Sequence, residues 1–122
     1  MKLYHVTNSA LLPSIKQFGL DPSKSKEPQF RDRNLYLSND LNHALGYVDH
    51  HGDWSGVLIL EIDSKDLNQK LLGPDDVDLP DILSQQGDEN WYEYSWEESL
   101  KICSQCTYSG IIPWNIINTV HI

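Results

Sequence analysis

Val57-Leu58-Ile59-Leu60-Glu61-Ile62 is the most strongly apolar run of this sequence. Its aliphatic and β-branched side chains favour a β-strand, and apolar residues follow one another almost continuously instead of alternating with polar ones. A strand of that kind has to be covered on both faces. Residues 57–62 therefore predict a strand with a central position in a sheet, and the rest of the chain has to supply its neighbours.

The chain before this strand predicts a strand, a helix and a second strand. Residues 2–7 contain Leu, Tyr, Val and Thr in alternation with other residues and favour a strand, as do residues 35–38. Between them, apolar side chains at helical spacing predict a helix over residues 11–18. Pro13 fits only the first turn of that helix, and Gly19 is a natural end for it.

Two further segments of the first half are expected to be a loop and a helix. Residues 21–33 contain two prolines and no apolar period, which favours an exposed loop. Ser38, Asn39 and Asp40 then offer N-caps for a helix over residues 41–47.

The chain after the central strand is less regular. The three leucines between residues 67 and 72 leave open a short helix or an irregular turn, and residues 73–76 (Gly-Pro-Asp-Asp) predict a break in regular structure. Residues 79–83 are expected to form one helical turn. Ser95-Trp96-Glu97-Glu98 has the capping-box pattern and predicts a helix that continues to about Cys103.

The C-terminal part predicts two more strands, over residues 107–109 and 118–122, with a helical turn at residues 113–117 between them. Short strands mixed with short helices indicate an α+β fold. A length of 122 residues favours a single domain over residues 1–122.

Composition narrows the class of protein. No apolar run approaches the ~18 residues of a membrane span, so we expect no membrane partner. Two cysteines, Cys103 and Cys106, lie too close together to close a useful loop, which favours a reduced, cytoplasmic chain. The net charge of −9 opposes nonspecific attraction to nucleic acid and disfavours DNA as a partner.

Charge is unevenly distributed. Five of the nine basic side chains lie between Lys16 and Arg33, whereas residues 75–98 are acidic and contain no Lys or Arg. We interpret residues 75–98 as a solvated face, with a surface for a basic partner as the alternative.

His5 lies in the first predicted strand and Tyr36 in the second, and Tyr47 follows eleven positions after Tyr36, at the end of the short predicted helix. In this pattern the sequence resembles the diphtheria-toxin and PARP-like (His-Tyr-Glu) branch of the ADP-ribosyltransferase superfamily. Its opening is similar to that of DarT-type transferases and, more distantly, of tRNA 2′-phosphotransferases. The resemblance rests on Tyr4-His5-Val6-Thr7, Ile15, Gly19-Leu20, Tyr36-Leu37-Ser38-Asn39-Asp40, Ala44, Tyr47, Gly110-Ile111-Ile112-Pro113 and Ile116.

The resemblance implies a small split antiparallel β-sheet with short helices, and NAD as co-substrate. His5 would bind the adenosine ribose, and main-chain groups near Val6 and Thr7 would hold the nicotinamide amide. Tyr36 and Tyr47 would sandwich the nicotinamide ring, since aromatic faces provide both burial and orientation.

The family's catalytic Glu has no clear counterpart in this chain. Alignment back from residues 110–113 places Gln105 at its position, and an amide supplies no negative charge. Glu98 or Glu97 would reach the site after a shift of register, although both also fit the first turn of a helix. Arg33 and Arg31 are candidates for pyrophosphate binding, with solvated loop charges as the alternative.

Each candidate also has a structural interpretation. A lone strand histidine is usually a bonded core residue, strand tyrosines follow β propensity, and Gln105 is a surface amide by default. Cys103 and Cys106 lack a second ligand pair for zinc, and His50-His51 resembles a metal cluster by composition only, so we expect no metal site.

The leading hypothesis is an NAD-dependent mono-ADP-ribosyltransferase that modifies a protein or another macromolecule. Because Gln105 replaces the acid, a catalytically degenerate protein that binds NAD or ADP-ribose is the first alternative. An acidic interaction protein of the inhibitor or antitoxin type is the second, and a phosphotransferase acting on RNA is the weakest.

Overall fold

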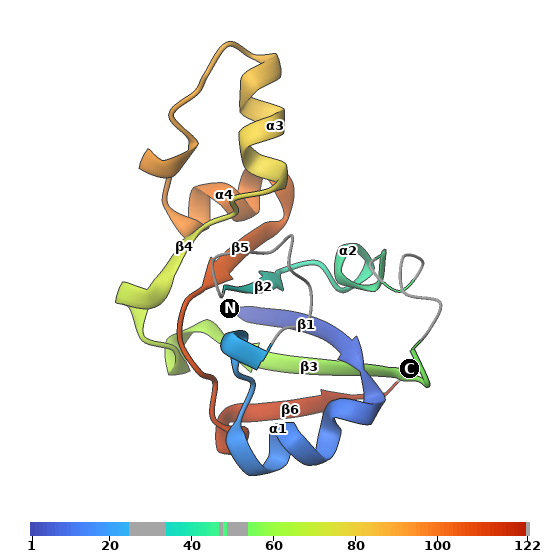
Figure 1. Ribbon diagram of the computed structural model, residues 1–122. Helices are drawn as coiled ribbons and strands as arrows, with labels where there is room; N and C mark the ends of the chain where they lie inside the picture. The colour runs from blue at the N-terminus through green and yellow to red at the C-terminus, as the bar shows by residue number, and fades with distance from the viewer. Residues whose placement is uncertain (25–33, 47, 49–53, 122) are drawn as a thin grey trace.

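The computed structural model describes residues 1–24, 34–46, 48 and 54–121. Within this part of the chain, six strands form one antiparallel sheet in the order β4-β5-β2-β1-β3-β6 (Figure 1). The α+β prediction is confirmed. The strands and helices are β1 (Lys2–Asn8), α1 (Leu12–Phe18), β2 (Leu35–Ser38), α2 (Leu41–Leu45), β3 (Val57–Asp63), β4 (Leu72–Pro74), α3 (Asp78–Gln85), α4 (Trp96–Cys103), β5 (Gln105–Tyr108) and β6 (Ile117–Val120).

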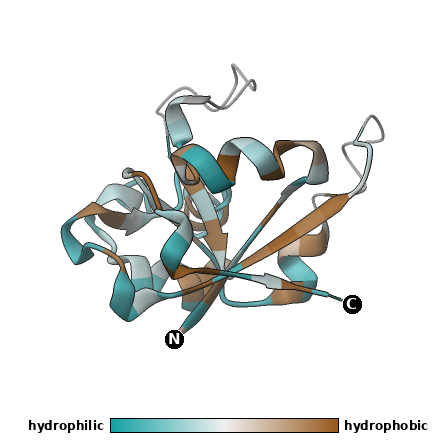
Figure 2. Cartoon of the chain, turned by 90° about the horizontal axis from the view of Figure 1, so that it is seen from below, coloured by the Kyte–Doolittle hydropathy of each residue, from teal (hydrophilic) through white to brown (hydrophobic). Residues whose placement is uncertain are grey.

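The central strand predicted over residues 57–62 is β3, which pairs with β1 on one side and with β6 on the other. Leu58, Ile59, Leu60 and Ile62 are all buried, so side chains on both faces of the strand are covered. Figure 2 shows apolar stretches along the strands in the middle of the molecule, whereas several of the outer turns are hydrophilic. Burial of this run supplies much of the main core.

The sheet consists of two three-stranded halves with a weak junction. β1 pairs with β3 along its whole length, from Lys2↔Asp63 to Asn8↔Val57. Between β1 and β2, by contrast, the register among the described residues comprises the single pair Tyr4↔Ser38. The two strands therefore separate beyond Tyr4, and one edge of β1 is left without a strand partner there in the described part of the chain.

Local sequence signals set the first two helices as expected. α1 begins after Leu11 with Pro13 in its first turn, and Gly19 follows its last residue with φ of 80°. A Cβ at Gly19 would lie 2.7 Å from the carbonyl oxygen of Ile112, so only glycine fits this close approach. The side chain of Asp40 caps α2, which ends at Leu45, before the predicted end at residue 47.

The predicted capping box of α4 is also present. The Ser95 hydroxyl accepts from the main-chain N–H of Glu98, and the Glu98 carboxylate accepts from the N–H of Ser95, both at 3.0 Å. Ser104 then takes the left-handed conformation with φ of 60° and leads directly into β5.

Two predictions for the segment between β3 and α4 were wrong in extent. The break expected at residues 73–76 overlaps the end of β4, which is an edge strand of the sheet. Pro74 is tolerated there because the outer side of an edge strand needs no main-chain N–H donor. The single turn expected at 79–83 is an eight-residue helix, α3. Its N-terminal amides are capped by Asp75, which lies outside the helix.

α3, α4 and the segment between them stand together at one end of the sheet, beyond β4 and β5 (Figure 1). They share a small core of their own, formed by Leu79, Leu83 and Cys103, with Trp91 and Tyr94 packed against it. We call residues 75–103 the helical lobe. No helix in the described part of the chain is long and apolar enough to span a membrane.

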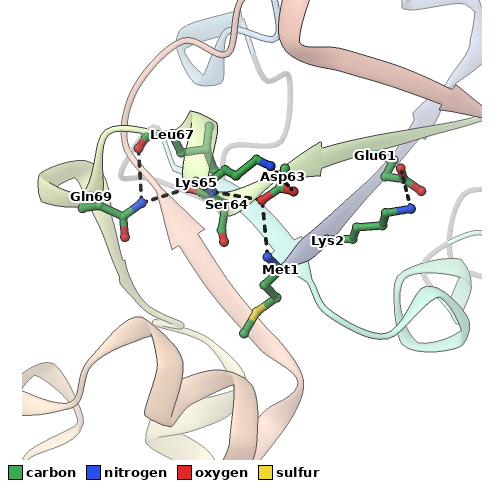
Figure 3. A network of polar contacts seen from close by, with 8 residues as sticks. All are labelled: Met1, Lys2, Glu61, Asp63, Ser64, Lys65, Leu67 and Gln69. Atoms are coloured by element: carbon green, nitrogen blue, oxygen red, sulfur yellow. Dashed lines mark hydrogen bonds and ion pairs between the residues drawn. The ribbon is translucent and has the colours of Figure 1, made fainter.

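Polar contacts tie the start of β1 to the end of β3 (Figure 3). The amino group of Met1 donates to Asp63 at 3.3 Å, and Lys2 pairs with Glu61 at 3.5 Å. Gln69 donates to main-chain carbonyls of the turn that follows β3. Exposed ion pairs of this kind contribute at most about 1 kcal/mol each, so they support the sheet without determining its topology.

Candidate functional site

His5 lies in the middle of β1, close to the point at which β1 and β2 separate. Its Nδ1 lies 2.9 Å from the main-chain carbonyl oxygen of Tyr36. A carbonyl can only accept, so Nδ1 carries the proton and Nε2 presents a lone pair. Burial lowers the pKa of His5 and outweighs the opposing effect of the hydrogen bond. The imidazole is therefore neutral at pH 7, and Nε2 is able to accept a hydrogen bond from a hydroxyl group.

Tyr36 forms hydrogen bonds through both its main-chain carbonyl and its phenol hydroxyl. Its carbonyl accepts from His5, while its phenol hydroxyl donates to Oδ1 of Asp76 at 2.7 Å. The other oxygen of Asp76 accepts from the Asn34 side chain at 3.5 Å. β2 therefore connects the histidine of β1 to a carboxylate that follows β4.

Val6 and Thr7 continue β1 beyond His5. Both pair with β3, Val6 opposite Ile59 and Thr7 opposite Leu58, and the Thr7 side chain is buried. These residues lie where the other edge of β1 has no strand partner among the described residues.

Gln105 is at the start of β5, where the sequence comparison places it, but its environment differs from the expected surface. The side chain is only 1% exposed, so the default interpretation as a surface amide is wrong. Its Nε2 donates to Oδ2 of Asp75, and Asp75 itself is fully buried. Gln105 thus forms a structural link between β5 and the segment that begins the helical lobe.

Asp75 completes this link with its other oxygen and its main chain. Oδ1 accepts from the main-chain N–H groups of Val77, Asp78 and Leu79, with distances of 2.9 Å to Val77 and 3.0 Å to Leu79. The N–H of Asp75 donates to the hydroxyl of Ser99, which in turn donates to the carbonyl of Gln105. We call Asp75, Ser99 and Gln105 the buried polar link. A carboxylate in place of the Gln105 amide would be repelled by Asp75, whereas the amide donates to it.

Glu98 is exposed on the first turn of α4, where it closes the capping box, and Glu97 is exposed beside it. Glu98 lines a shallow groove of about 290 Å³ together with Asp88, Asn90, Glu93 and Tyr94. All of these residues belong to the helical lobe, and none comes from β1 or β2. The structure therefore does not bring Glu98 together with His5.

Two carboxylates that sequence reasoning assigned to a solvated face lie against other elements instead, Asp76 against Tyr36 of β2 and Asp78 near His43 of α2. Asp76 is half-buried against Tyr36, as described above. The pKa of Asp78 is raised by burial and by the negative charge of Asp75, and a nearby His43 of α2 partly opposes this. The signal in the sequence was the Asp75-Asp76-Val77-Asp78 run directly after Pro74, but a local pattern does not reveal which strand such a run will face.

Arg31, Arg33, Tyr47, His50 and His51 lie outside the described residues. Both cysteines are buried and free of disulfides. Burial raises the pKa of Cys103, and raises that of Cys106 to about 12, so both thiols stay protonated and unreactive at neutral pH. Cys103 ends α4, as predicted, and Cys106 lies in β5, which begins two residues before the strand predicted over residues 107–109.

Comparison of this chain with protein-family models, with curated proteins and with solved structures finds no match.

Proposed function

We propose that this protein is an NAD-dependent mono-ADP-ribosyltransferase that attaches one ADP-ribose to a protein or another macromolecule. The observation that carries the proposal is the neutral His5, which presents Nε2 as an acceptor and is bonded to Tyr36 where β1 and β2 separate. A ribose hydroxyl is a fitting donor for that nitrogen, and a tyrosine beside it offers an aromatic face to the nicotinamide ring.

The reaction breaks the bond between nicotinamide nitrogen and ribose C1′. Nicotinamide leaves with the bonding electrons, the sugar gains oxocarbenium character, and a nucleophile of the acceptor then bonds to C1′ and gives up a proton. A site for this reaction has to hold the two ends of NAD in place and to stabilise positive charge on the sugar. His5 and Tyr36 fit the first requirement. Asp76 accepts a hydrogen bond from Tyr36 and so brings a carboxylate to this pair of residues.

The test is incubation of the purified protein with NAD labelled in its adenylate part, together with candidate acceptor proteins. We expect His5→Ala and Tyr36→Ala to abolish nicotinamide release and label transfer. His121→Ala and Tyr92→Ala change the same residue types at exposed positions and serve as matched controls. NAD turnover that is unchanged in both site variants would exclude the proposal.

A protein that binds NAD or ADP-ribose without chemistry is the alternative that the buried polar link favours. Gln105 stands where the family has its Glu, and its amide is engaged by Asp75. Calorimetry that finds NAD binding sensitive to His5→Ala, with no nicotinamide released over hours, would favour this alternative. Absence of any binding would exclude both the alternative and the enzyme.

The helical lobe favours a second candidate, an interaction with a basic partner. Residues 75–98 contain nine Asp and Glu and no Lys or Arg, and the groove lined by Asp88, Glu93 and Glu98 lies in this lobe. A complex held by these charges has to weaken as salt is added, because exposed charges are screened. Affinity for a basic partner that stays constant between low and high salt would exclude this candidate. The same net charge disfavours DNA as the acceptor.

A further inference from the structure

The phenol hydroxyl of Tyr36 donates to Asp76, although the strands that carry or precede these two residues are not paired with each other. Asp76 follows β4, at the far edge of the sheet, whereas Tyr36 lies in β2, and β5 separates the two strands. The contact of 2.7 Å between the phenol hydroxyl and Oδ1 therefore crosses over β5. Register places Tyr36 opposite Thr107 of β5, and the Thr107 hydroxyl donates to the carbonyl of Pro74 at 3.0 Å.

The segment that carries Asp76 is held firmly. On one side, Pro74 pairs with Cys106 in the sheet and accepts from Thr107. On the other side, Asp75 is fixed by the buried polar link and by the N-terminal amides of α3. Asp76 directly follows Asp75 and precedes Val77, whose N–H donates to Asp75, so the main chain is held on both sides of Asp76. An oxygen held in this way can orient the phenol ring more effectively than solvent can.

We propose that Asp76 is a positioning residue that sets the orientation of the Tyr36 ring for a bound nicotinamide group. The inference rests on the proposed function, since it assigns Asp76 a role at the same site. Asn34, which donates to the second oxygen of Asp76 at 3.5 Å, keeps the carboxylate turned toward β2. Asp76 thereby differs from its neighbour Asp75, whose two oxygens are both directed into the fold.

The first experiment follows the contact without NAD. Protein labelled with ¹³C at the tyrosine ring carbon that bears the hydroxyl is titrated with base, and the Tyr36 signal is assigned by its loss in Tyr36→Phe. A carboxylate acceptor stabilises the protonated phenol, so Asp76→Asn should lower the pH at which Tyr36 ionises. The matched control Asp81→Asn removes one charge from an exposed position of α3 and should leave that pH nearly unchanged. If both variants changed the ionisation of Tyr36 equally, the hydrogen bond between Tyr36 and Asp76 would be contradicted, and the positioning role with it.

The second experiment measures NAD affinity by calorimetry and nicotinamide release by kinetics. Asp76→Ala should weaken NAD binding by roughly 3- to 10-fold, the usual worth of one hydrogen bond. Asp76→Asn keeps an acceptor oxygen and should restore most of that binding. The double variant Asp76→Ala with Tyr36→Phe should bind no more weakly than the worse of its two single variants, since both remove the same contact.

The results separate this inference from the proposed function. NAD binding that depends on His5 and Tyr36 but not on Asp76 would overturn the positioning role alone. Full loss of nicotinamide release in Asp76→Asn with unchanged NAD affinity would also overturn it, because the charge would then act on the reacting sugar. Absence of NAD binding in the unmodified protein, with the Tyr36 titration still dependent on Asp76, would overturn the proposed function and leave the contact purely structural.

Discussion

The His5–Tyr36 contact and the buried polar link lie in neighbouring parts of one sheet and differ in what they leave available. In the His5–Tyr36 contact, Nδ1 of the imidazole donates to the carbonyl of Tyr36, and Nε2 is left as an acceptor for a ligand. In the buried polar link, Asp75 accepts from the main chain of α3 and from Gln105, and Ser99 joins the two by further bonds. Polar residues near a candidate site therefore need not bind a ligand, because hydrogen bonds inside the fold can occupy all of their donors and acceptors.

The largest expected effect comes from breaking the buried polar link. Asp75→Ala should lower the free energy of unfolding by about 3–4 kcal/mol, because it removes a helix cap and leaves the Gln105 amide buried without its acceptor. Asp76→Ala, one residue further on, is the matched control and should cost under about 1.5 kcal/mol, since a half-buried group is resolvated more easily. Urea unfolding measures both. Equal losses in the two variants would contradict the distinction between the two regions.

A smaller effect is expected when Gln105 is changed to Glu, the catalytic residue of the ADP-ribosyltransferases that the sequence resembles. In Gln105→Glu the new carboxyl lies beside Asp75, so burial and like charge raise its folded pKa above the unfolded value of about 4.3. Below pH ~4 the new carboxyl is protonated, and the variant should be about as stable as the unmodified protein. As the pH rises through the raised pKa, the free energy of unfolding of the variant should fall about 1–3 kcal/mol below that of the unmodified protein.

Nicotinamide release in the same variant sharpens the comparison. If Gln105 is a structural residue, Gln105→Glu should not increase release from NAD, whereas a residue facing the nicotinamide ribose should. A marked gain of activity would show that position 105 belongs to the site. Urea unfolding at pH 4 and pH 8 provides the accompanying check on the fold.

The capping box offers a still smaller test. Glu98→Ala should lower the free energy of unfolding by about 0.5–1 kcal/mol through the loss of one side-chain cap, with no change in NAD affinity. Glu97→Ala removes the same charge from the same turn but leaves the capping box of Ser95 and Glu98 intact, and should cost less. A loss of NAD binding specific to Glu98→Ala would place this acid in the site after all.

The smallest effect concerns the protonation of His5. Because burial lowers its folded pKa, the folded state binds fewer protons than the unfolded state, and His5 contributes stability above the unfolded pKa of about 6.5 that is lost as pH falls through the folded value. The difference in stability between the unmodified protein and His5→Gln should therefore shrink as the pH is lowered from 7 to 5. A difference that grows on acidification would mean that the folded imidazole is charged.

Elements with local signals were predicted well. Pro13 and Gly19 bound the first helix correctly, and Ser95 with Glu98 marked the start of α4, because these caps act within one turn of the chain. The predicted ends were less accurate at α2, where the helix stops at Leu45. The placement of Tyr47 and Arg33 lies outside the described residues, so their predicted roles stay predictions.

The surroundings of the carboxylates were the hardest to predict. Glu98 was chosen because it is near Gln105 in the sequence, yet it caps its own helix. Asp76 was not chosen because it lies 40 residues from Tyr36, and only the strand order β4-β5-β2 brings the two together. Two residues this far apart in the sequence leave no local pattern from which their contact could be predicted.

The α+β class, the apolar strand at residues 57–62 and the local end signals of α1, α2 and α4 could be read from the sequence alone, because periodicity and capping depend on residues a few positions apart. Only the tertiary structure decided which polar residues are engaged inside the fold and which face outward. Asp75 and Asp76 have the same chemistry and adjacent positions, but one is fully buried against Gln105 and the other holds Tyr36. The physical reason is that strand order and register assign partners to these carboxylates, and both are settled by long-range packing.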